Sequence, residues 1–405
     1  MSRHLKVRFM DRTTPPHILT LVLLSGLGAM SMSAFLPSLP SMTAYFDTDY
    51  GIMQLSVSLY LAMVAVLQLI FGPLSDRFGR RSISVVAVGI FTVASLGCMV
   101  APNIEAFLFF RMLQAVVAAG LVISRAIVRD MVPQEEAASM IGYVTMGMAL
   151  IPMVAPILGG ALDEAFNWQA IFLALSVAGL GVFVLCHYDL GETWQGEGKT
   201  LGEQIKDYPE LLTSPRFWGY ALAAAFASGA FFAFLGGAPL IASDVYGLSA
   251  VWAGVGFGAP AIGYVVGNGL SGRYSVQFGI NWMIKTGILV SAAGLAVAIL
   301  LVAMGYDSAL MFFAFCTFVG LGNGMVIPNS SAGMLSVRPH LAGTASGLGG
   351  SLMIGGGAAM SVLAGFAMKL GGGSMPLLII MTVTMLLALV AIIYVIRREK
   401  TLQSQ

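Results

Sequence analysis

A charged loop holds several of the residues able to do chemistry in this 405-residue chain. It reads FGPLSDRFGRR (71–81), with Asp76 followed by Arg77, Arg80 and Arg81. A carboxylate beside guanidinium groups forms ion pairs and charge-assisted hydrogen bonds, and free arginines also bind anionic lipid. An ordinary cationic loop that sets membrane topology is the simpler alternative, but it leaves the Asp-Arg-x-Gly-Arg-Arg spacing unexplained.

A second group of polar residues lies in the apolar segment FLFFRMLQAVVAAGLVISRAIVRD (107–130). An arginine in the middle of a membrane helix costs at least about 2.5–3.5 kcal/mol, so it is a functional candidate by default. Arg111 and Gln114 are three residues apart and share a helix face, and Arg125 lies within about 40° of that face on a regular helix. The alternative is that these arginines snorkel to the membrane surface.

Other reactive residue types show no catalytic or metal-binding spacing. The three cysteines sit in apolar runs and are expected to pack as small core residues, and the histidines lie near segment ends without a partner at ligand distance. We therefore expect a protein that is not an enzyme and has no metal, no organic cofactor and no nucleic-acid partner. The residues concerned are Cys98, Cys186, Cys316, His4, His17, His187 and His340.

Composition places these residues in a membrane protein. Hydrophobic residues make up 58% of the chain and charged residues 10%, whereas a soluble domain has about 25% charged residues. Apolar runs long enough to cross roughly 30 Å of hydrocarbon recur along the sequence. Because isolated strands would leave backbone groups unsatisfied in lipid, we expect an all-α polytopic membrane protein.

We predict twelve transmembrane helices with both termini cytoplasmic. In this topology nearly all of the 20 Lys and Arg fall on the inner side and only Lys369 falls outside, which is a strong positive-inside bias. The predicted spans are about 17–40, 51–71, 83–101, 105–128, 137–161, 168–188, 216–240, 250–271, 283–304, 309–329, 342–367 and 374–396.

The polar segment 189–215 divides the chain into two six-helix bundles and serves either as a regulatory linker or as a simple tether. GPLSDRFGRR is faintly echoed about 200 residues later by GLSGRYSVQFG (269–279), which suggests a repeat unless the similarity of Gly-rich loops is chance. A 6 + 6 repeat is typical of transporters whose halves rock around a site near the bilayer midplane. The expected parts are a tail (1–16), a bundle (17–188), the linker (189–215), a second bundle (216–396) and a tail (397–405).

GPLSDRFGRR closely resembles the loop signature between the second and third helices of the major facilitator superfamily. The resemblance implies the major facilitator fold and a latch, in which the aspartate pairs with a nearby arginine and caps a helix of the opposite half when the cytoplasmic side is closed. It assigns the cap to Asp76, the ion pair to Arg77, and tight contacts to Gly72 and Gly79.

The fourth and sixth spans are similar to the Bcr/CflA branch of drug efflux proteins. RMLQ resembles the superfamily motif whose arginine, here Arg111, is implicated in proton coupling. The SRAIVRD ending of the fourth span and NWQAIF (167–172) point to the same branch.

The fifth span reads GYVTMGMALIPMVAPILGGAL (142–162) and partly resembles the antiporter motif of exporters. Pro156 can kink the helix, and Gly159 and Gly160 allow close packing against a neighbour. Ile151 and Ala155 replace two glycines of the motif, so an ordinary kinked helix is the alternative.

The first span departs from the pattern. Related exporters carry D-x-Y-L-P there, but MSMSAFLPSLP (30–40) aligns Ser33 and Phe35 with the aspartate and tyrosine. All 19 Asp and Glu lie in loops or at span ends. A membrane carboxylate attracts a cation and releases it on protonation, so without one we expect neutral or anionic compounds to be preferred, and proton coupling stays an open question.

The resemblance implies that spans one, four, seven and ten line the central path. Each aromatic residue on these spans is more readily explained by packing than by substrate contact, although methionine and aromatic side chains together suit an adaptable pocket. The candidate substrate contacts are Ser33, Phe35, Tyr60, Arg111, Gln114, Ser124, Arg125, Phe231, Phe234, Asn323 and Asn329.

Together these features favour a monomeric drug or metabolite exporter in the bacterial inner membrane, in contact with lipid and driven by the proton gradient. A metabolite importer or uniporter of the same fold is the main alternative, because the span-one acid is missing. A receptor or scaffold is a third possibility, but no large soluble domain supports it.

Overall fold

The computed structural model describes residues 7–131, 151, 153–194, 201–338, 341–368 and 371–403. Within these ranges every regular element is a helix, which confirms the all-α fold. Eleven of the described helices are long and apolar enough to cross a membrane. The fifth predicted span (137–161) lies largely outside the described residues, and its described part is helical at 151 and from 153 onward.

The N-terminal half contains five described spans, of which the first, the second and the fourth are interrupted. Prolines at 37 and 40 start new helical segments, so the first span ends in a 3₁₀ turn and a short helix. The helices are α1 (Ile18–Ser33), the turn Leu36–Ser38, α2 (Leu39–Tyr45), α3 (Tyr50–Met53), α4 (Leu55–Phe78), α5 (Arg80–Met99), α6 (Ile104–Gln114), α7 (Ala118–Met131) and α9 (Gln169–Asp189).

The C-terminal half contains six spans, preceded by a helix in the linker. The linker helix is amphipathic, as its polar sequence suggests, and the spans are apolar along most of their length. The helices are α10 (Leu201–Leu212), α11 (Pro215–Leu240) with its extension Ile241–Val245, α12 (Ala250–Phe257), α13 (Ala259–Phe278), α14 (Ile280–Ala303), α15 (Ala309–Val337), α16 (Ala342–Met368) and α17 (Met375–Gln403).

Two equivalent turns support the predicted repeat. Gly79 ends α4 with φ 92° and ψ 144°, and Gly279 ends α13 with φ 82° and ψ 155°. Positive φ of this kind is readily adopted only by glycine. The same backbone turn thus recurs 200 residues apart, at the end of the second helix of each half.

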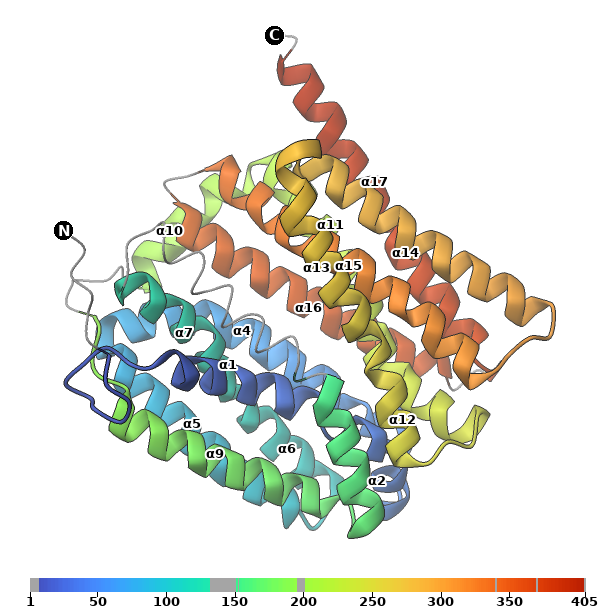
Figure 1. The fold of residues 1–405 in the computed structure, drawn as a ribbon, viewed down its shortest axis with the longest axis horizontal. Helices are drawn as coiled ribbons and strands as arrows, with labels where there is room; N and C mark the ends of the chain where they lie inside the picture. The colour runs from blue at the N-terminus through green and yellow to red at the C-terminus, as the bar shows by residue number, and fades with distance from the viewer. Residues whose placement is uncertain are drawn as a thin grey trace.

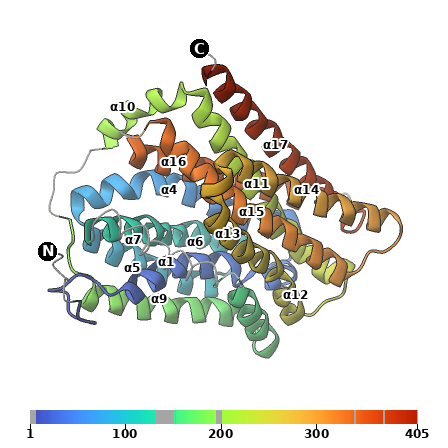
Figure 2. The same cartoon turned by 45° about the horizontal axis from the view of Figure 1, so that its top comes forward.

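The two halves lie side by side and meet mainly through α4 and α16 (Figure 1). Helix α10 contacts both of these helices and lies over their ends (Figure 2). Following the positive-inside rule, we call the end that holds Gly79, Gly279 and α10 the cytoplasmic end and the opposite end the extracellular end. This arrangement places α1, α4 and α6 around the polar interior of the N-terminal half.

Candidate functional site

Arg111 is the centre of a buried polar cluster in the N-terminal half. Its side chain is 1% exposed. Nη1 donates to Gln114 Oε1 at 2.6 Å and to the carbonyl and hydroxyl oxygens of Ser31 on α1, both at 3.3 Å. Nε donates to the carbonyl oxygen of Ser56 on α4 at 3.3 Å. One guanidinium group therefore joins three helices.

Two aromatic rings cover the faces of the same guanidinium group. Its carbon lies 4.3 Å from the ring centroid of Phe35 and 4.4 Å from that of Tyr60. A desolvated cation–π contact is worth about 2 kcal/mol or more, so the rings replace part of the hydration that Arg111 loses. The break in the first span supplies this geometry, because Phe35 sits directly before the 3₁₀ turn.

The cluster carries an uncompensated positive charge. Among the described residues Arg111 forms no ion pair with an acidic side chain, and its buried Nη2 has no hydrogen-bond partner. Arginine stays protonated in proteins, and an unpaired buried charge is costly. The free Nη2 is therefore a donor available to an electron-rich group.

Gln114 fixes the orientation of the cluster. Its amide nitrogen donates to the hydroxyl of Ser95 on α5 at 2.7 Å, so its oxygen faces Arg111. The sequence predicted that Arg111 and Gln114 share a face, and the structure brings them into contact. Ser31, Ser56 and Ser95 were missed, because a serine in an apolar span has no sequence signal that shows which helix it faces.

The remaining N-terminal candidates lie apart from this cluster. Ser33 donates to the carbonyl of Ala29 in its own helix, and Ser124 donates to the carbonyl of Leu21, which joins α7 to α1. Arg125 is exposed and is separated from Arg111 by 14 residues, or about 21 Å of helix. It lies within electrostatic reach of Tyr264 on α13, in the opposite half.

The C-terminal candidates divide into an aromatic cluster and two asparagines. Phe234 is fully buried and stacks with Phe231 and Phe312, with ring centroids 6.4 and 6.3 Å away. Asn329 donates to Ser271 on α13 and to the Met325 carbonyl, both at 2.7 Å. Asn323 is also buried, and its Oδ1 has no partner in the described part of the chain.

The charged loop forms a network within the N-terminal half. Asp76 pairs with Arg80, one helical turn away. Arg80 also bonds Asp130 at the end of α7, at 3.1 Å, and donates to Ser75. In this structure Arg77 lies over the ring of Phe78, and the pairing of Asp76 with Arg77 stays a prediction for the state that is closed to the cytoplasm.

Glu192, in the segment after α9, completes the loop network. Its carboxylate accepts the backbone N–H groups of Arg80 and Arg81 at 2.9 and 3.2 Å, at the N-terminus of α5, where the helix dipole favours negative charge. A Cβ on Gly79 would lie 2.3 Å from Glu192 Oε2, so the tight contact predicted for Gly79 is present. The one predicted for Gly72 is absent here, since a Cβ there would meet nothing within 4 Å.

The antiporter-like motif packs tightly at the extracellular end. A Cβ on Gly159 would lie 1.7 Å from the Ala34 carbonyl oxygen, and one on Gly160 would lie 2.3 Å from that of Ala250. In return, a Cβ on Gly254 would lie 2.5 Å from the Pro156 carbonyl oxygen. The helix of residues 153–165 is thus held against both the first span and α12, which agrees with the close packing predicted for these glycines.

An acidic side chain strengthens this contact between the halves. Glu164 accepts the backbone N–H of Val251 at 2.8 Å. This hydrogen bond and one from the Ser249 hydroxyl hold the pKa of the Glu164 carboxyl below its usual value. At neutral pH the ionised carboxylate therefore sits at the N-terminus of α12.

Comparison with known proteins decides what this architecture is. A family model of the Major Facilitator Superfamily matches residues 21–361. The chain belongs to this superfamily. It is therefore a multi-pass membrane transporter and not an enzyme, as the sequence predicted.

The curated relatives of this superfamily member include bacterial resistance proteins. The chain is 31% identical over 338 residues to a chloramphenicol resistance protein of Pseudomonas aeruginosa, covering 81% of this chain and 79% of that protein. It is 27% identical over 357 residues to a bicyclomycin resistance protein homolog of Haemophilus influenzae, covering 87% and 89% of the two chains. These matches confirm the resemblance to Bcr/CflA-type transporters.

A solved structure of the superfamily shares the fold. The bacterial homolog of the human lysosomal transporter Spinster, in an inward-facing and occupied conformation, superimposes with a TM-score of 0.73 at 17% identity. The match covers 95% of this chain and 96% of that one. At this identity the likeness establishes the major facilitator fold alone.

Proposed function

We propose that this transporter exports small amphipathic drugs or metabolites, neutral or anionic, from the cytoplasm by alternating access in exchange for protons. Relatives named for resistance to chloramphenicol and bicyclomycin support export of antibiotics. The main alternative is a metabolite importer or uniporter of the same fold, which the serine at position 33 favours because a span-one carboxylate is missing.

The observation that carries the substrate preference is the uncompensated charge of Arg111. No carboxylate pairs with it in the described residues, and its Nη2 has no partner. A cationic drug would be repelled by this charge, whereas a carbonyl, nitro or carboxylate group would accept a hydrogen bond from it. The Phe35 and Tyr60 rings would pack against the apolar part of such a molecule.

The contacts between the halves support alternating access. At the extracellular end Tyr50 donates to the Gly236 carbonyl at 3.0 Å, and Gln54 donates to Ser361 at 2.6 Å. At the cytoplasmic ends of α4 and α16, a Cβ on Gly72, Gly343 or Gly347 would meet nothing within 4 Å. We interpret the contacts at the extracellular end, together with the open space at these cytoplasmic positions, as a state that is closed to the outside, with Arg111 occluded.

In the opposite state we propose that the predicted latch forms. Among the described residues Asp76 is bonded only within its own half, and its side chain is 25% exposed. Closing the cytoplasmic ends would bring α16 toward α4, and the Asp76 carboxylate would then cap the start of α16. The ion pair with Arg80 would hold Asp76 ready for that contact.

An accumulation assay tests the export of drugs. Cells that express the protein should accumulate less of a neutral phenicol-like antibiotic than cells that do not. Arg111→Gln should abolish the difference, because it removes the charge and the free donor. Arg273→Gln, which removes an exposed cytoplasmic arginine, is the matched control and should leave export intact. Unchanged accumulation over a broad panel, with measurable uptake of a metabolite, would favour the importer.

Proton exchange needs a separate measurement. The purified protein is placed in proteoliposomes that contain a pH-sensitive dye. When substrate is added and crosses the membrane, protons should move in the opposite direction and change the pH of the lumen. Substrate flux without any pH change would point to facilitated diffusion instead and would refute the coupling while leaving the transport proposal in place.

A further inference from the structure

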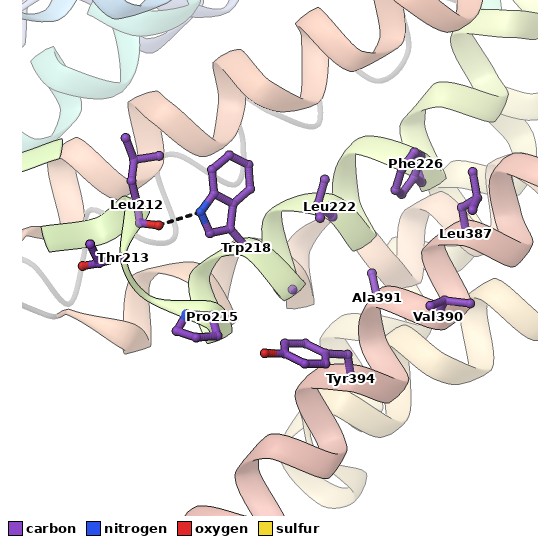
Figure 3. A pocket seen from close by; sticks show the side chains of 11 residues that line it. Leu212, Thr213, Pro215, Trp218, Leu222, Phe226, Leu387, Val390, Ala391 and Tyr394 are labelled. Carbon is purple, nitrogen blue, oxygen red and sulfur yellow. Dashed lines mark hydrogen bonds between the residues drawn. The ribbon is translucent and has the colours of Figure 1, made fainter. Parts of the chain in front are cut away.

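An apolar groove of about 580 Å³ lies on the outer surface of the C-terminal half, between α11 and α17 (Figure 3). Leu222 and Phe226 of α11 form one wall, and Leu387 and Val390 of α17 form the other. Leu387 and Val390 are 43% and 66% exposed, so the groove opens to the surroundings of the bundle, which in a membrane are lipid tails. Its volume is that of a small-molecule site.

The dimensions of the groove match one leaflet of a bilayer. Its α11 wall runs from Pro215 to Phe226, and 11 residues of helix span about 16 Å. Half of a hydrocarbon core is about 15 Å thick. The groove starts at the cytoplasmic end of α11, so it covers the depth of the cytoplasmic leaflet and stops near the bilayer centre.

Two aromatic residues frame the cytoplasmic mouth of the groove. The Trp218 indole donates to the Leu212 carbonyl at 2.7 Å, which fixes the ring, and Tyr394 lies across the mouth with its hydroxyl toward Pro215 (Figure 3). Tyr394 is 49% exposed. Tryptophan and tyrosine prefer the headgroup level of a membrane, so the mouth is placed where a lipid headgroup would be.

Two arginines continue the α17 wall beyond this mouth. Leu387, Val390 and Tyr394 follow one another at helical spacing, and the next turn of the same stripe holds Arg397 and Arg398. Both arginines are exposed, and neither forms an ion pair in the described part of the chain.

The neighbouring Arg216 differs in this respect. Its Nη2 pairs with Glu399 Oε1 at 2.7 Å, and Glu399 also accepts from Tyr220 and Asn281. The charge of Arg216 is thus balanced within the protein, whereas those of Arg397 and Arg398 face outward, toward the membrane surface.

We propose that this groove is a binding site for an anionic phospholipid of the cytoplasmic leaflet. One acyl chain would fill the groove between α11 and α17, and the negatively charged headgroup would lie between Arg397, Arg398 and the Tyr394 hydroxyl. Exposed basic residues at the cytoplasmic surface attract anionic lipid, and the groove adds apolar burial for the tail. A zwitterionic lipid would gain the second contribution but little of the first.

The position of the site connects the lipid to the linker. Leu212 and Thr213, at the end of α10, line the same groove, and α10 contacts α4 and α16 of the two halves. A lipid bound here would therefore stabilise the end of the linker helix that lies over both bundles.

Native mass spectrometry of the purified full chain tests the proposal, with phosphatidylglycerol and phosphatidylethanolamine as probes. We expect phosphatidylglycerol to bind at least about tenfold more tightly. The double variant Arg397→Gln, Arg398→Gln should remove this preference. Val390→Trp, at an exposed position, should fill the groove and weaken the binding of both lipids.

Arg273→Gln is the matched control, because it removes another exposed cytoplasmic arginine that lies on α13, away from the groove. It should keep the preference for phosphatidylglycerol. Equal binding of the two lipids, an equal loss in Arg273→Gln, or unchanged binding in Val390→Trp would overturn the proposal. If neither lipid bound in the groove but a neutral amphiphile did, the proposal would also be overturned, in favour of a substrate entry site.

Discussion

Replacing Gly160 by alanine tests whether the antiporter-like motif closes the extracellular side. The added Cβ would lie 2.3 Å from the Ala250 carbonyl oxygen, 2.5 Å from its carbonyl carbon and 2.8 Å from the Val251 nitrogen. All three are backbone atoms, so no side-chain rotation relieves the clash. Since carbon atoms pack best at about 3.5–4.0 Å, the two helices would have to separate by about 1 Å.

The energetic effect follows from this displacement. Overpacking of a tight contact costs about 1–3 kcal/mol, and a mid-range cost of about 2 kcal/mol shifts a two-state equilibrium about 30-fold. The cost applies only to the state in which the halves touch at the extracellular end. Gly160→Ala should therefore populate the state that is open to the outside.

Distances between spin labels measure this shift. Phe166 and Leu310 are 74% and 83% exposed at the extracellular ends of the two halves, and labels there should report a larger share of long distances in Gly160→Ala. The matched control is Gly181→Ala in α9, where a Cβ would meet nothing within 4 Å. The reasoning fails if Gly160→Ala leaves the distances unchanged, or if Gly181→Ala changes them equally.

Three further predictions concern the charged groups. Asp189 is buried and accepts from the Met10 and His17 backbone nitrogens and the Thr20 hydroxyl at 2.7, 2.9 and 2.6 Å. Asp189→Ala should therefore lower the free energy of unfolding, measured by detergent denaturation, by about 2–3 kcal/mol, and an unchanged unfolding transition would contradict this role. The contact with α12 lowers the pKa of Glu164, so it favours extracellular closure above about pH 4.3 and is lost as the pH falls. The same spin labels should report acid-induced opening, which Glu164→Gln should abolish. Arg80→Lys keeps the charge but loses the planar guanidinium fork that reaches both Asp76 and Asp130, so thermal unfolding should show that the free energy of unfolding falls by about 1–2 kcal/mol. An equal fall in Arg77→Lys would count against the network.

The architecture was predictable because it depends on local properties of the chain. Apolar runs marked the spans, the distribution of Lys and Arg predicted their direction, and the loop at 71–81 pointed to the superfamily before any comparison. Arg111 stood out for the same reason, since a charge in an apolar segment is visible in the sequence itself. Helical spacing alone placed Gln114 on the same face.

The partners of these residues were less predictable. In this structure Asp76 pairs with Arg80, one helical turn away, and Asp130 and Glu192 reach the loop from other segments. The candidate substrate contacts were chosen by span number, yet Ser124 and Asn329 bond within the helix packing. Which residue faces a neighbour depends on the rotation of each helix about its axis, and hydropathy does not encode that rotation when a span is apolar on every side.

The sequence by itself determined that this protein is a helical membrane transporter with a cation in its fourth span and no acid in its first, because hydropathy and charge are properties of each segment alone. Only the tertiary structure decided that Arg111 lies between Phe35 and Tyr60 and bonds the carbonyls of Ser31 and Ser56. Those groups come from helices far apart in the chain, and their meeting depends on how the helices pack in depth and rotation.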